Sequence, residues 1–160
     1  MADSDLYRDG LLDDVVPFWL RHGLDHEHGG VLTCLDRDGT VYDSDKSVWF
    51  QGRCGWLMGT LAAEVEPREE WIAACRSCVD FLRRHCFDTD GRMYFTVTRE
   101  GRPLRKRRYV FSEMFAAMAL AAWSAVADDE SAAREAAEES LAVFERGVAR
   151  MRAPGGIEPK

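Results

Sequence analysis

The sequence repeats itself at a fixed spacing, and this repeat restricts the fold more than any other feature. A shift of the chain by 62 positions, without a gap, places these residues on identical or chemically similar ones: Gly29 on Gly91, Arg37 on Arg99, Asp38 on Glu100, Gly39 on Gly101, Lys46 on Arg108, Val48 on Val110 and Trp49 on Phe111. Such self-similarity is typical of repeated supersecondary units, each of which needs neighbours to cover its apolar face. We therefore expect a row of similar units.

Hydrophobic periodicity and turn residues predict what the first unit contains. A helix is expected from Ser4, a candidate N-cap, to Gly23, with its last turns bent at Pro17. The period then changes to that of strands, and a turn-rich segment separates two short β-prone runs, which predicts a β-hairpin. The hairpin runs are Val31 to Leu35 and Thr40 to Tyr42, and a helix from about Ser47 to Val65 follows them.

The same order returns in the second half of the chain. The expected elements are a helix from Pro67 to about His85, a hairpin from Met93 to Leu104, a helix from Phe111 to Val126 and a helix from about Glu130 to Arg150. A third unit would place its hairpin near positions 153 to 156 and its inward helix after the last residue, Lys160. The sequence thus predicts an all-α protein with short β-hairpins, in which residues 1–160 form part of one domain cut within the third unit.

The helix from Ser47 to Val65 carries a cation in an apolar setting. At about 100° per residue, Trp49, Arg53 and Trp56 lie within about 60° of one another, so the guanidinium projects between two indoles. A buried guanidinium needs partners for its five donors, so either this chain supplies acids or the arginine faces a cavity that admits a ligand. The alternative is an amphipathic helix with a snorkelling arginine. Because the repeat has Phe115 at the matching position, the architecture does not require Arg53.

Charge and composition exclude several classes of partner. The net charge of −7 argues against nucleic acid or an anionic membrane as the main partner. No apolar run approaches the roughly 20 residues that span a bilayer. Five cysteines make an odd number, and no apolar signal segment begins the chain, so we expect a cytoplasmic protein with reduced thiols. The basic run Arg102, Arg105, Lys106, Arg107 and Arg108 is interpreted as a solvated edge strand, with an anion site as the alternative.

No metal or cofactor is expected. Cys75 and Cys78 form a CxxC pair inside a helical pattern, but no second pair accompanies them. His26 and His28 lie in a turn without a third ligand beside them. Glycine-rich phosphate-binding motifs do not occur, so a bound nucleotide is not predicted.

Two blocks of the sequence resemble the N-acylglucosamine 2-epimerase family, which also contains cellobiose 2-epimerases and aldose–ketose isomerases. They are HEHGGVLTCLDRDGTVYDSDKSVWFQGRCGW and GRMYFTVTREGRPLRKRRYVFSEMFAAMALA, which carry a WxxxR and an FSExF motif. The resemblance covers about Leu11 to Lys160. It implies an (α/α)6 barrel whose inner helices surround a sugar-binding cleft, and this chain would supply about five of the twelve helices.

The resemblance also implies a chemistry. Enzymes of this family are thought to act on the open-chain sugar, where one histidine removes the C2 proton to form an enediolate and a second returns a proton. It implies that Arg53 is catalytic, through contact with the reacting oxygens, and that Trp49 and Phe111 bind substrate. The family's catalytic histidines match positions beyond Lys160, so His22, His26, His28 and His85 receive no catalytic role and the fragment alone is expected to be inactive.

Two alternatives remain open. One is a non-catalytic helical-repeat module whose aromatic and arginine face binds a carbohydrate or a peptide. The other is a glycoside hydrolase on the same scaffold, which would need a pair of carboxylates in the cleft, with Glu113 as the candidate acid. The expected partner is a small-molecule sugar substrate, and the full-length protein could form a homodimer.

Overall fold

The structure of the chain is a computed structural model that describes residues 3–106 and 109–154. Its helices are α1 (Asp3–Asp9), α2 (Val16–His22), α3 (Val48–Glu64), α4 (Glu69–His85), α5 (Phe111–Val126) and α6 (Glu130–Arg152). Its strands are β1 (Cys34–Leu35), β2 (Val41–Asp43), β3 (Lys46–Ser47), β4 (Thr96–Val97) and β5 (Pro103–Arg105). A π-helical stretch, Gly10–Val15, joins α1 to α2 in one continuous helix.

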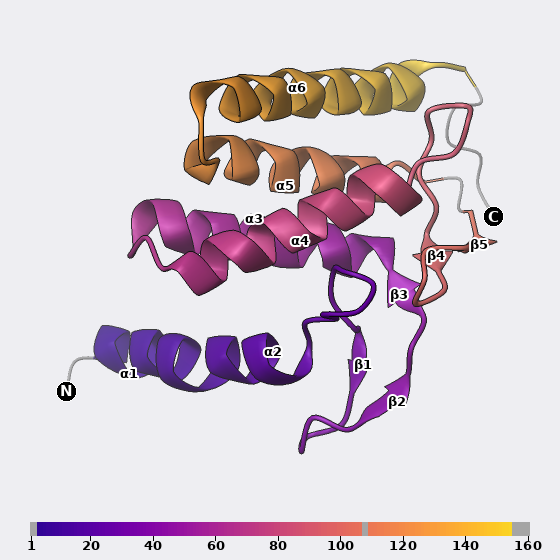
Figure 1. The fold of residues 1–160 in the computed structure, drawn as a ribbon. Helices are drawn as coiled ribbons and strands as arrows, with labels where there is room; N and C mark the ends of the chain where they lie inside the picture. The colour runs from indigo at the N-terminus through magenta and orange to yellow at the C-terminus, as the bar shows by residue number, and fades with distance from the viewer. Residues whose placement is uncertain (1–2, 107–108, 155–160) are drawn as a thin grey trace.

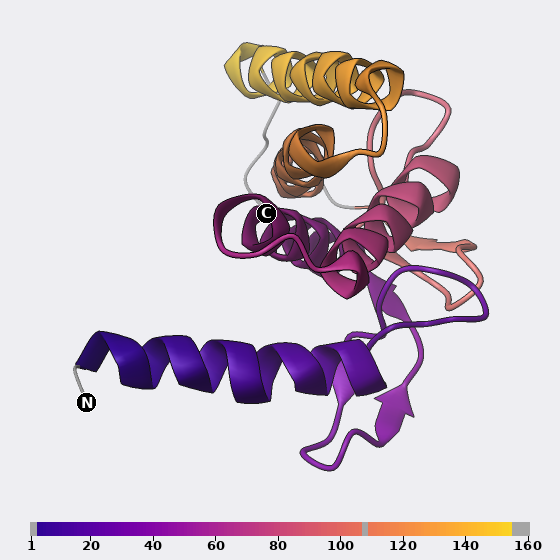
Figure 2. The same ribbon diagram turned by 60° about the vertical axis from the view of Figure 1, so that its left-hand side comes forward.

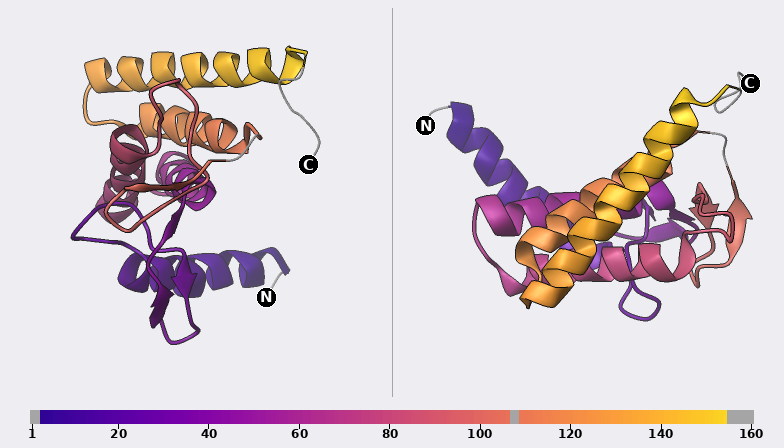
Figure 3. Two further views of the ribbon diagram at one scale, coloured as in Figure 1. Left: turned by 90° about the vertical axis from the view of Figure 1, so that its right-hand side faces the viewer. Right: turned by 90° about the horizontal axis from the view of Figure 1, so that it is seen from above.

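The helices are stacked in a row that follows the chain. α3 packs against α4 and α5, and α5 packs against α6. The α1–α2 helix lies at one end of the row and α6 at the other, while the strands gather where α3 and α5 begin (Figure 1). Figure 2 shows α1–α2 running past the α3–α4 pair, and the left view of Figure 3 shows α1–α2 and α6 on opposite sides. Helical repeats therefore build the body of the molecule.

Three glycines decide which side of α3 faces the core. A Cβ atom at Gly52 would lie 2.7 Å from the backbone of Phe115, and one at Gly55 would lie 3.2 Å from the Cβ atoms of Ala119 and Cys78. Gly59 meets α5 and α4 in the same way. Because the neighbouring helices approach this side so closely, the opposite side of α3 lies outside the core.

The local contacts of the two hairpins confirm the repeat. Gly39 and Gly101 have φ angles of 87° and 92°, a backbone region that favours glycine. Their N–H groups donate to the equivalent carbonyls of Asp36 and Thr98. His22 at the end of α2 packs beneath Gly39, and its counterpart at the end of α4 packs beneath Gly101. His22 and His85 are 63 positions apart, whereas Gly39 and Gly101 are 62 apart. The difference arises because the loop after α2 has one residue more than the loop after α4.

The predicted elements agree with the structure except at their ends and in one pairing. The first helix begins at Asp3, so Ser4 lies inside it and is not its N-cap. The π-helical stretch precedes Pro17, where we expected a bend in the last turns, and a widened turn avoids the clash between the proline ring and the carbonyl four residues earlier. β3 was not predicted: it pairs with β4 and makes a three-stranded sheet.

Two expectations concern residues outside the described ranges. The hairpin expected near positions 153 to 156 falls only partly on described residues, as does the basic run that includes Arg107 and Arg108. Within the ranges that the structure describes, no helix combines the length and the apolar character needed to cross a bilayer.

Candidate functional site

Aromatic rings from both repeat units meet where α3 and α5 begin. The indole of Trp49, in the first turn of α3, lies with its ring centroid 5.3 Å from Phe111 and 5.8 Å from Phe115 of α5. Phe95, just before β4, contributes a third ring at 5.5 Å in an edge-on contact. Phe111 is half exposed, at 50%. The cluster therefore offers a ring to solvent while its other rings hold Trp49 in place.

Arg53 lies beside this cluster, one turn further along α3. Its guanidinium carbon is 5.4 Å from the centroid of the Phe115 ring, which is a cation–π contact. The side chain is exposed, and among the described residues it has neither a hydrogen bond nor an ion pair. The sequence left two possibilities for a buried arginine, an acidic partner or a cavity that admits a ligand. Among the described residues, no acidic side chain pairs with Arg53. Phe115 contacts both Trp49 and Arg53, and Phe111 contacts Trp49, so these side chains lie close together. The roles expected for Arg53, Trp49 and Phe111 stay predictions.

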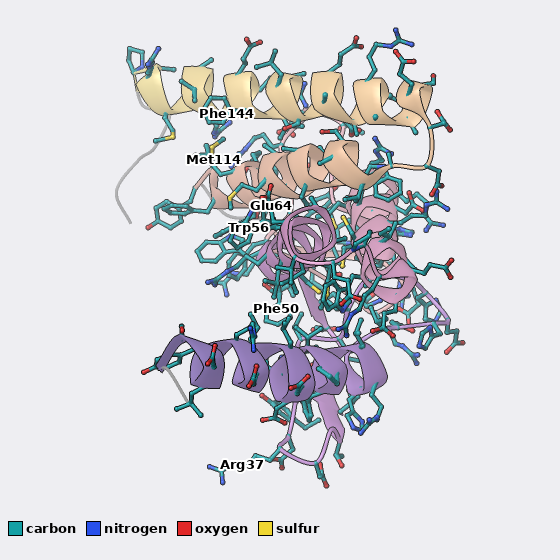
Figure 4. All side chains as sticks on the ribbon, turned by 90° about the vertical axis from the view of Figure 1, so that its left-hand side faces the viewer. Arg37, Phe50, Trp56, Glu64, Met114 and Phe144 are labelled. Atoms are coloured by element: carbon teal, nitrogen blue, oxygen red, sulfur yellow. The ribbon has the colours of Figure 1, made fainter. Side chains whose placement is uncertain are left out.

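A hollow of about 350 Å³ lies between α2 and α3. Its walls are mostly apolar and include Val15, Trp19, Phe50 and Trp56, and Arg53 is the one charged residue among those that line it. Trp56 is 40% exposed. Figure 4 shows Phe50 between α2 and α3, with Trp56 above it on the open side of α3. The indole of Trp56 and the guanidinium of Arg53 therefore border a shared concave surface, but Trp49, which the helical spacing also placed beside Arg53, is not among the residues that line it.

A buried ion cluster fastens the second hairpin to the first unit. The Lys46 ammonium, fully buried, donates to Asp25 Oδ2 at 2.8 Å and to the carbonyls of Gly29 and Arg99. Arg99 donates from Nε and Nη2 to the two oxygens of Asp25, at 2.9 Å each. Burial opposes ionisation of Asp25, but the hydrogen bonds from Arg99 and Lys46 outweigh it and lower its pKa below the ordinary value. The cluster fixes β3, and with it the start of α3.

Glu113 is buried against the second hairpin, so it is not placed to act as the candidate acid of the glycoside hydrolase hypothesis. The residue is only 5% exposed, and its Oε1 accepts a hydrogen bond from the Met93 N–H at 3.0 Å. Its other oxygen, Oε2, is buried without a partner among the described residues. The helical position of Glu113, third in α5, turns it toward the second hairpin while Phe111 turns outward.

The histidines and cysteines have other surroundings. His22 and His85 pack beneath hairpin glycines, His26 is exposed in a turn, and His28 lies beside Glu27. Cys54, Cys75, Cys78 and Cys86 are buried free thiols, and burial raises the pKa of Cys75 and Cys86 to about 12. Within the described ranges, no group of three or more histidine, cysteine, aspartate or glutamate residues is placed to hold a metal ion.

The part of the basic run that the structure describes is largely paired with acids. Lys106 Nζ lies 2.6 Å from Asp88 and 2.7 Å from Asp90, and Arg102 lies 3.5 Å from Glu100. Arg105 is exposed in β5. These contacts favour the interpretation as a solvated edge strand over an anion site.

Sequence comparison relates the chain to sugar epimerases. The family model described as N-acylglucosamine 2-epimerase (GlcNAc 2-epimerase) matches residues 30–158. The N-acylglucosamine 2-epimerase of Mus musculus is 43% identical over 113 residues, which are 68% of this chain and 27% of that protein. The cellobiose 2-epimerase of Ruminococcus albus is 26% identical over 127 residues, which are 78% of this chain and 32% of that protein.

Solved structures share the fold. A sugar epimerase from a ruminal bacterium has a TM-score of 0.76 at 24% identity, over 91% of this chain and 37% of that one. A D-mannose isomerase has a TM-score of 0.75 at 18% identity, over 91% of this chain and 36% of that one. The chain thus spans about a third of the length of the proteins it matches. Because the family model matches far more than half of the chain, this chain belongs to the N-acylglucosamine 2-epimerase family.

Proposed function

We propose that the chain is the N-terminal part of a sugar 2-epimerase or aldose–ketose isomerase, and that Arg53, Trp49 and Phe111 bind the open-chain sugar. In this proposal the chain supplies about five of the twelve helices of an (α/α)6 barrel, cut within its third helix–hairpin–helix unit. The substrate is a small sugar, and the protein acts in the cytoplasm. Relatives named for N-acylglucosamine, cellobiose and D-mannose support the substrate class.

The exposed guanidinium of Arg53 beside the aromatic cluster carries the proposal. Arg53 has no hydrogen bond or ion pair among the described residues, and its guanidinium carbon lies 5.4 Å from the centroid of the Phe115 ring. Its donors can therefore bind the oxygens of a ligand. Its planar fork of donors suits two adjacent sugar oxygens, and its positive charge stabilises negative charge that develops on them in an enediolate. The Phe111 ring, half exposed and 5.3 Å from Trp49, supplies an apolar surface for the sugar's carbon-bound hydrogens.

Proton transfer at C2 then falls to histidines in later helices of the complete protein. Among the described contacts, none joins His22, His26, His28 or His85 to Arg53. The chain by itself therefore binds sugar without turning it over. A non-catalytic binding module is the second candidate, and this absence of a nearby histidine within the described contacts is the observation that favours it.

Isotope exchange separates the two candidates. The 160-residue chain and the same chain extended to the length of its relatives would be incubated in D₂O with N-acetylglucosamine, cellobiose or mannose, and deuterium at C2 measured by NMR. We expect exchange of one sugar by the extended protein and none by the chain alone. An extended protein that binds a sugar but never exchanges its C2 proton would favour the binding module.

A binding titration tests the site within the chain alone. Chemical shifts of the tryptophan indole N–H groups would be followed as each sugar is added, in the wild type and in Arg53→Ala. Arg76→Ala is the matched control, because Arg76 is also an exposed arginine over an aromatic ring, 5.0 Å from the Trp123 centroid, but on the α4 side. Loss of the shifts in Arg53→Ala alone would support the proposed site, and equal losses in both variants would contradict it.

A further inference from the structure

Three cysteines gather where α3 packs against α4. Cys54 lies in α3, and Cys75 and Cys78 lie one turn apart in α4. A Cβ atom at Gly55, next to Cys54, would lie 3.2 Å from the Cys78 Cβ atom, and one at Gly59 would lie 3.0 Å from the Cys75 Sγ atom. All three cysteines are free thiols in the core. Because the glycines let the two helices approach so closely, thiols of opposite helices meet.

Cys54 is paired with Cys78 rather than with Cys75. A side-chain hydrogen bond to Cys54, together with burial, raises the pKa of Cys78, so Cys78 keeps its proton at neutral pH. Cys75 instead accepts a hydrogen bond from the backbone of Gly59, and burial raises the pKa of Cys75 to about 12. The packing of α3 on α4 thus brings one particular pair of thiols into direct contact.

Cys54 is the thiol of this pair that a small reagent can reach. It is 8% exposed, whereas Cys75 and Cys78 are both 0% exposed. Cys54 also lines the hollow of about 350 Å³ between α2 and α3, together with Arg53, and neither Cys75 nor Cys78 is among the described residues that line it. A small neutral oxidant such as a hydroperoxide can therefore meet Cys54 from the hollow, while Cys78 stays covered.

We propose that Cys54 is a modification site, at which a small hydroperoxide oxidises the thiol to a sulfenic acid that Cys78 then converts to a disulfide between α3 and α4. In the first step the Cys54 sulfur attacks the terminal peroxide oxygen, an S–O bond forms, and the O–O bond breaks. The second peroxide oxygen leaves with the Cys54 proton, as water or an alcohol. The peroxide gains the two electrons that Cys54 loses.

The second step needs no further oxidant. The Cys78 sulfur attacks the Cys54 sulfur, an S–S bond forms, and the S–O bond breaks. The departing hydroxide takes the Cys78 proton and leaves as water. The disulfide would fix the middle of α3, one residue from Arg53, to α4, and a thiol reductant would reverse it. This inference goes beyond the sugar chemistry and rests on the thiol pair and the hollow alone.

Peptide mapping after oxidation tests the pairing in the unsubstituted chain. The folded chain, at low concentration, would be treated with hydrogen peroxide, its remaining thiols blocked with iodoacetamide in denaturant, and the product digested with trypsin without a reductant. Intervening arginines place Cys54, Cys75 and Cys78 on three separate tryptic peptides. We expect a linked pair of peptides that holds Cys54 and Cys78, and that dithiothreitol separates. A link from Cys54 to Cys75, or oxidation confined to the more accessible Cys34, would overturn the proposal.

Cys78→Ala separates the two steps, with Cys75→Ala as the matched control. In Cys78→Ala the sulfenic acid should persist on Cys54, where dimedone traps it. In Cys75→Ala the disulfide should form as fast as in the wild type. In Cys54→Ala, Cys78 should not react with peroxide while the chain is folded, which circular dichroism checks. Dimedone on Cys78 in this last variant, or its absence from Cys54 in folded Cys78→Ala, would contradict the assigned roles.

Access through the hollow has its own control in the wild type. In the folded chain peroxide should consume Cys54 at least tenfold faster than Cys75, and in urea the two rates should become similar, because unfolding exposes both thiols. Similar rates in the folded chain would overturn the access that the hollow provides. Sugar binding and C2 exchange enter none of these measurements, so failure here leaves the proposed function intact, and failure of the proposed function leaves this modification site intact.

Discussion

Gln51 and Glu113 occupy the same position in the two repeat units and hold equivalent backbone groups, but only Gln51 satisfies both of them. The Gln51 amide accepts from the Val31 N–H and donates to the Val31 carbonyl, both at 2.7 Å. Glu113 accepts from the Met93 N–H at 3.0 Å, and its second oxygen has no partner among the described residues. The shift that relates the hairpins carries Val31 onto Met93, so Glu113 makes the same contact as Gln51 but lacks the side-chain N–H donor.

The first prediction follows from that missing donor. Glu113→Gln supplies an N–H group where the unpartnered oxygen lies, and should raise the free energy of unfolding by about 1 kcal/mol, the usual net value of a hydrogen bond. Urea denaturation at neutral pH measures it. The reverse change, Gln51→Glu, is the matched control and should destabilise the chain. A lower midpoint for Glu113→Gln would show that the second oxygen has a role that an amide cannot fill.

The second prediction separates function from stability at Arg53. Because its side chain is exposed, Arg53→Ala should change the free energy of unfolding of this chain by less than about 0.5 kcal/mol. Under the proposed function, Arg53→Ala in the chain extended to the length of its relatives should lower turnover by about 10² to 10³-fold, the usual loss for one donor to a developing oxyanion. Arg53→Lys should recover only part of the rate, because it keeps the charge but loses the planar pair of donors. Circular dichroism is the folding control, and an unfolded Arg53→Ala variant would mean a structural role.

The third prediction concerns the aromatic cluster. Phe111→Ala removes a half-exposed ring and should weaken sugar binding with little change in turnover, since ring stacking acts on ground and transition states alike. Trp49→Ala should weaken sugar binding further and also lower stability, because Trp49 packs against three phenylalanine rings. Steady-state kinetics of the complete enzyme, with KM and kcat determined separately, decide this. A variant whose kcat falls while KM stays constant would contradict the assignment.

The fourth prediction is a loss of stability in acid. The pKa of Asp25 is lowered in the folded chain from its ordinary value of 3.8, so the unfolded chain takes up the proton first as the pH falls. The stability that ionised Asp25 contributes is therefore complete above about pH 4 and is lost progressively below it. Asp88, whose pKa is lowered to about 2 by Lys106 and by backbone hydrogen bonding, acts in the same direction.

Two aspartate variants test whether the buried ion cluster around Asp25 causes this loss of stability in acid. Asp25→Asn should flatten the acid dependence and cost about 3 kcal/mol or more at neutral pH, because it leaves the buried Lys46 without its counter-ion. Asp88 is the repeat counterpart of Asp25, and its side chain is more exposed, so Asp88→Asn should have a smaller effect on stability at neutral pH. Urea midpoints between pH 2 and 7 measure both. Equal neutral-pH losses for the two variants would count against the buried cluster as the cause.

The fifth prediction is that this chain alone binds hydrophobic dyes and aggregates. A groove of about 430 Å³ between α5 and α6 is lined mostly by apolar residues, of which Leu141 is 57% and Phe144 49% exposed. Figure 4 shows Phe144 on the side of α6 that faces α5. Leu141→Lys with Phe144→Lys should reduce dye binding and aggregation without loss of stability. Val143→Lys, at a position only 1% exposed, is the control and should unfold the chain.

Local signals in the sequence were enough to locate most elements. The helix expected from Phe111 to Val126 has those bounds in the structure, since apolar periodicity begins after a turn and ends before a polar segment. The hairpin turns were predictable because Gly39 and Gly101 adopt positive φ angles that few other residues tolerate. The repeat was visible because equivalent turns require equivalent residues. Helical periodicity and turn conformation depend on a residue and its near neighbours, so both can be predicted from the sequence.

What the order of residues could not decide is which side of a helix is inside. Helical geometry placed Trp49, Arg53 and Trp56 on a common side of α3, but α3 is apolar on nearly every side, so periodicity did not show whether that side is buried. In the structure, α5 and α4 pack closely against Gly52 and Gly55 on the opposite side of α3, so that opposite side is the buried one. The Asp25–Arg99 ion pair and the pairing of β3 with β4 were likewise beyond the sequence, since they join segments far apart along the chain. Burial and long-range pairing depend on the whole fold, and only the tertiary structure left Arg53 exposed beside the aromatic cluster.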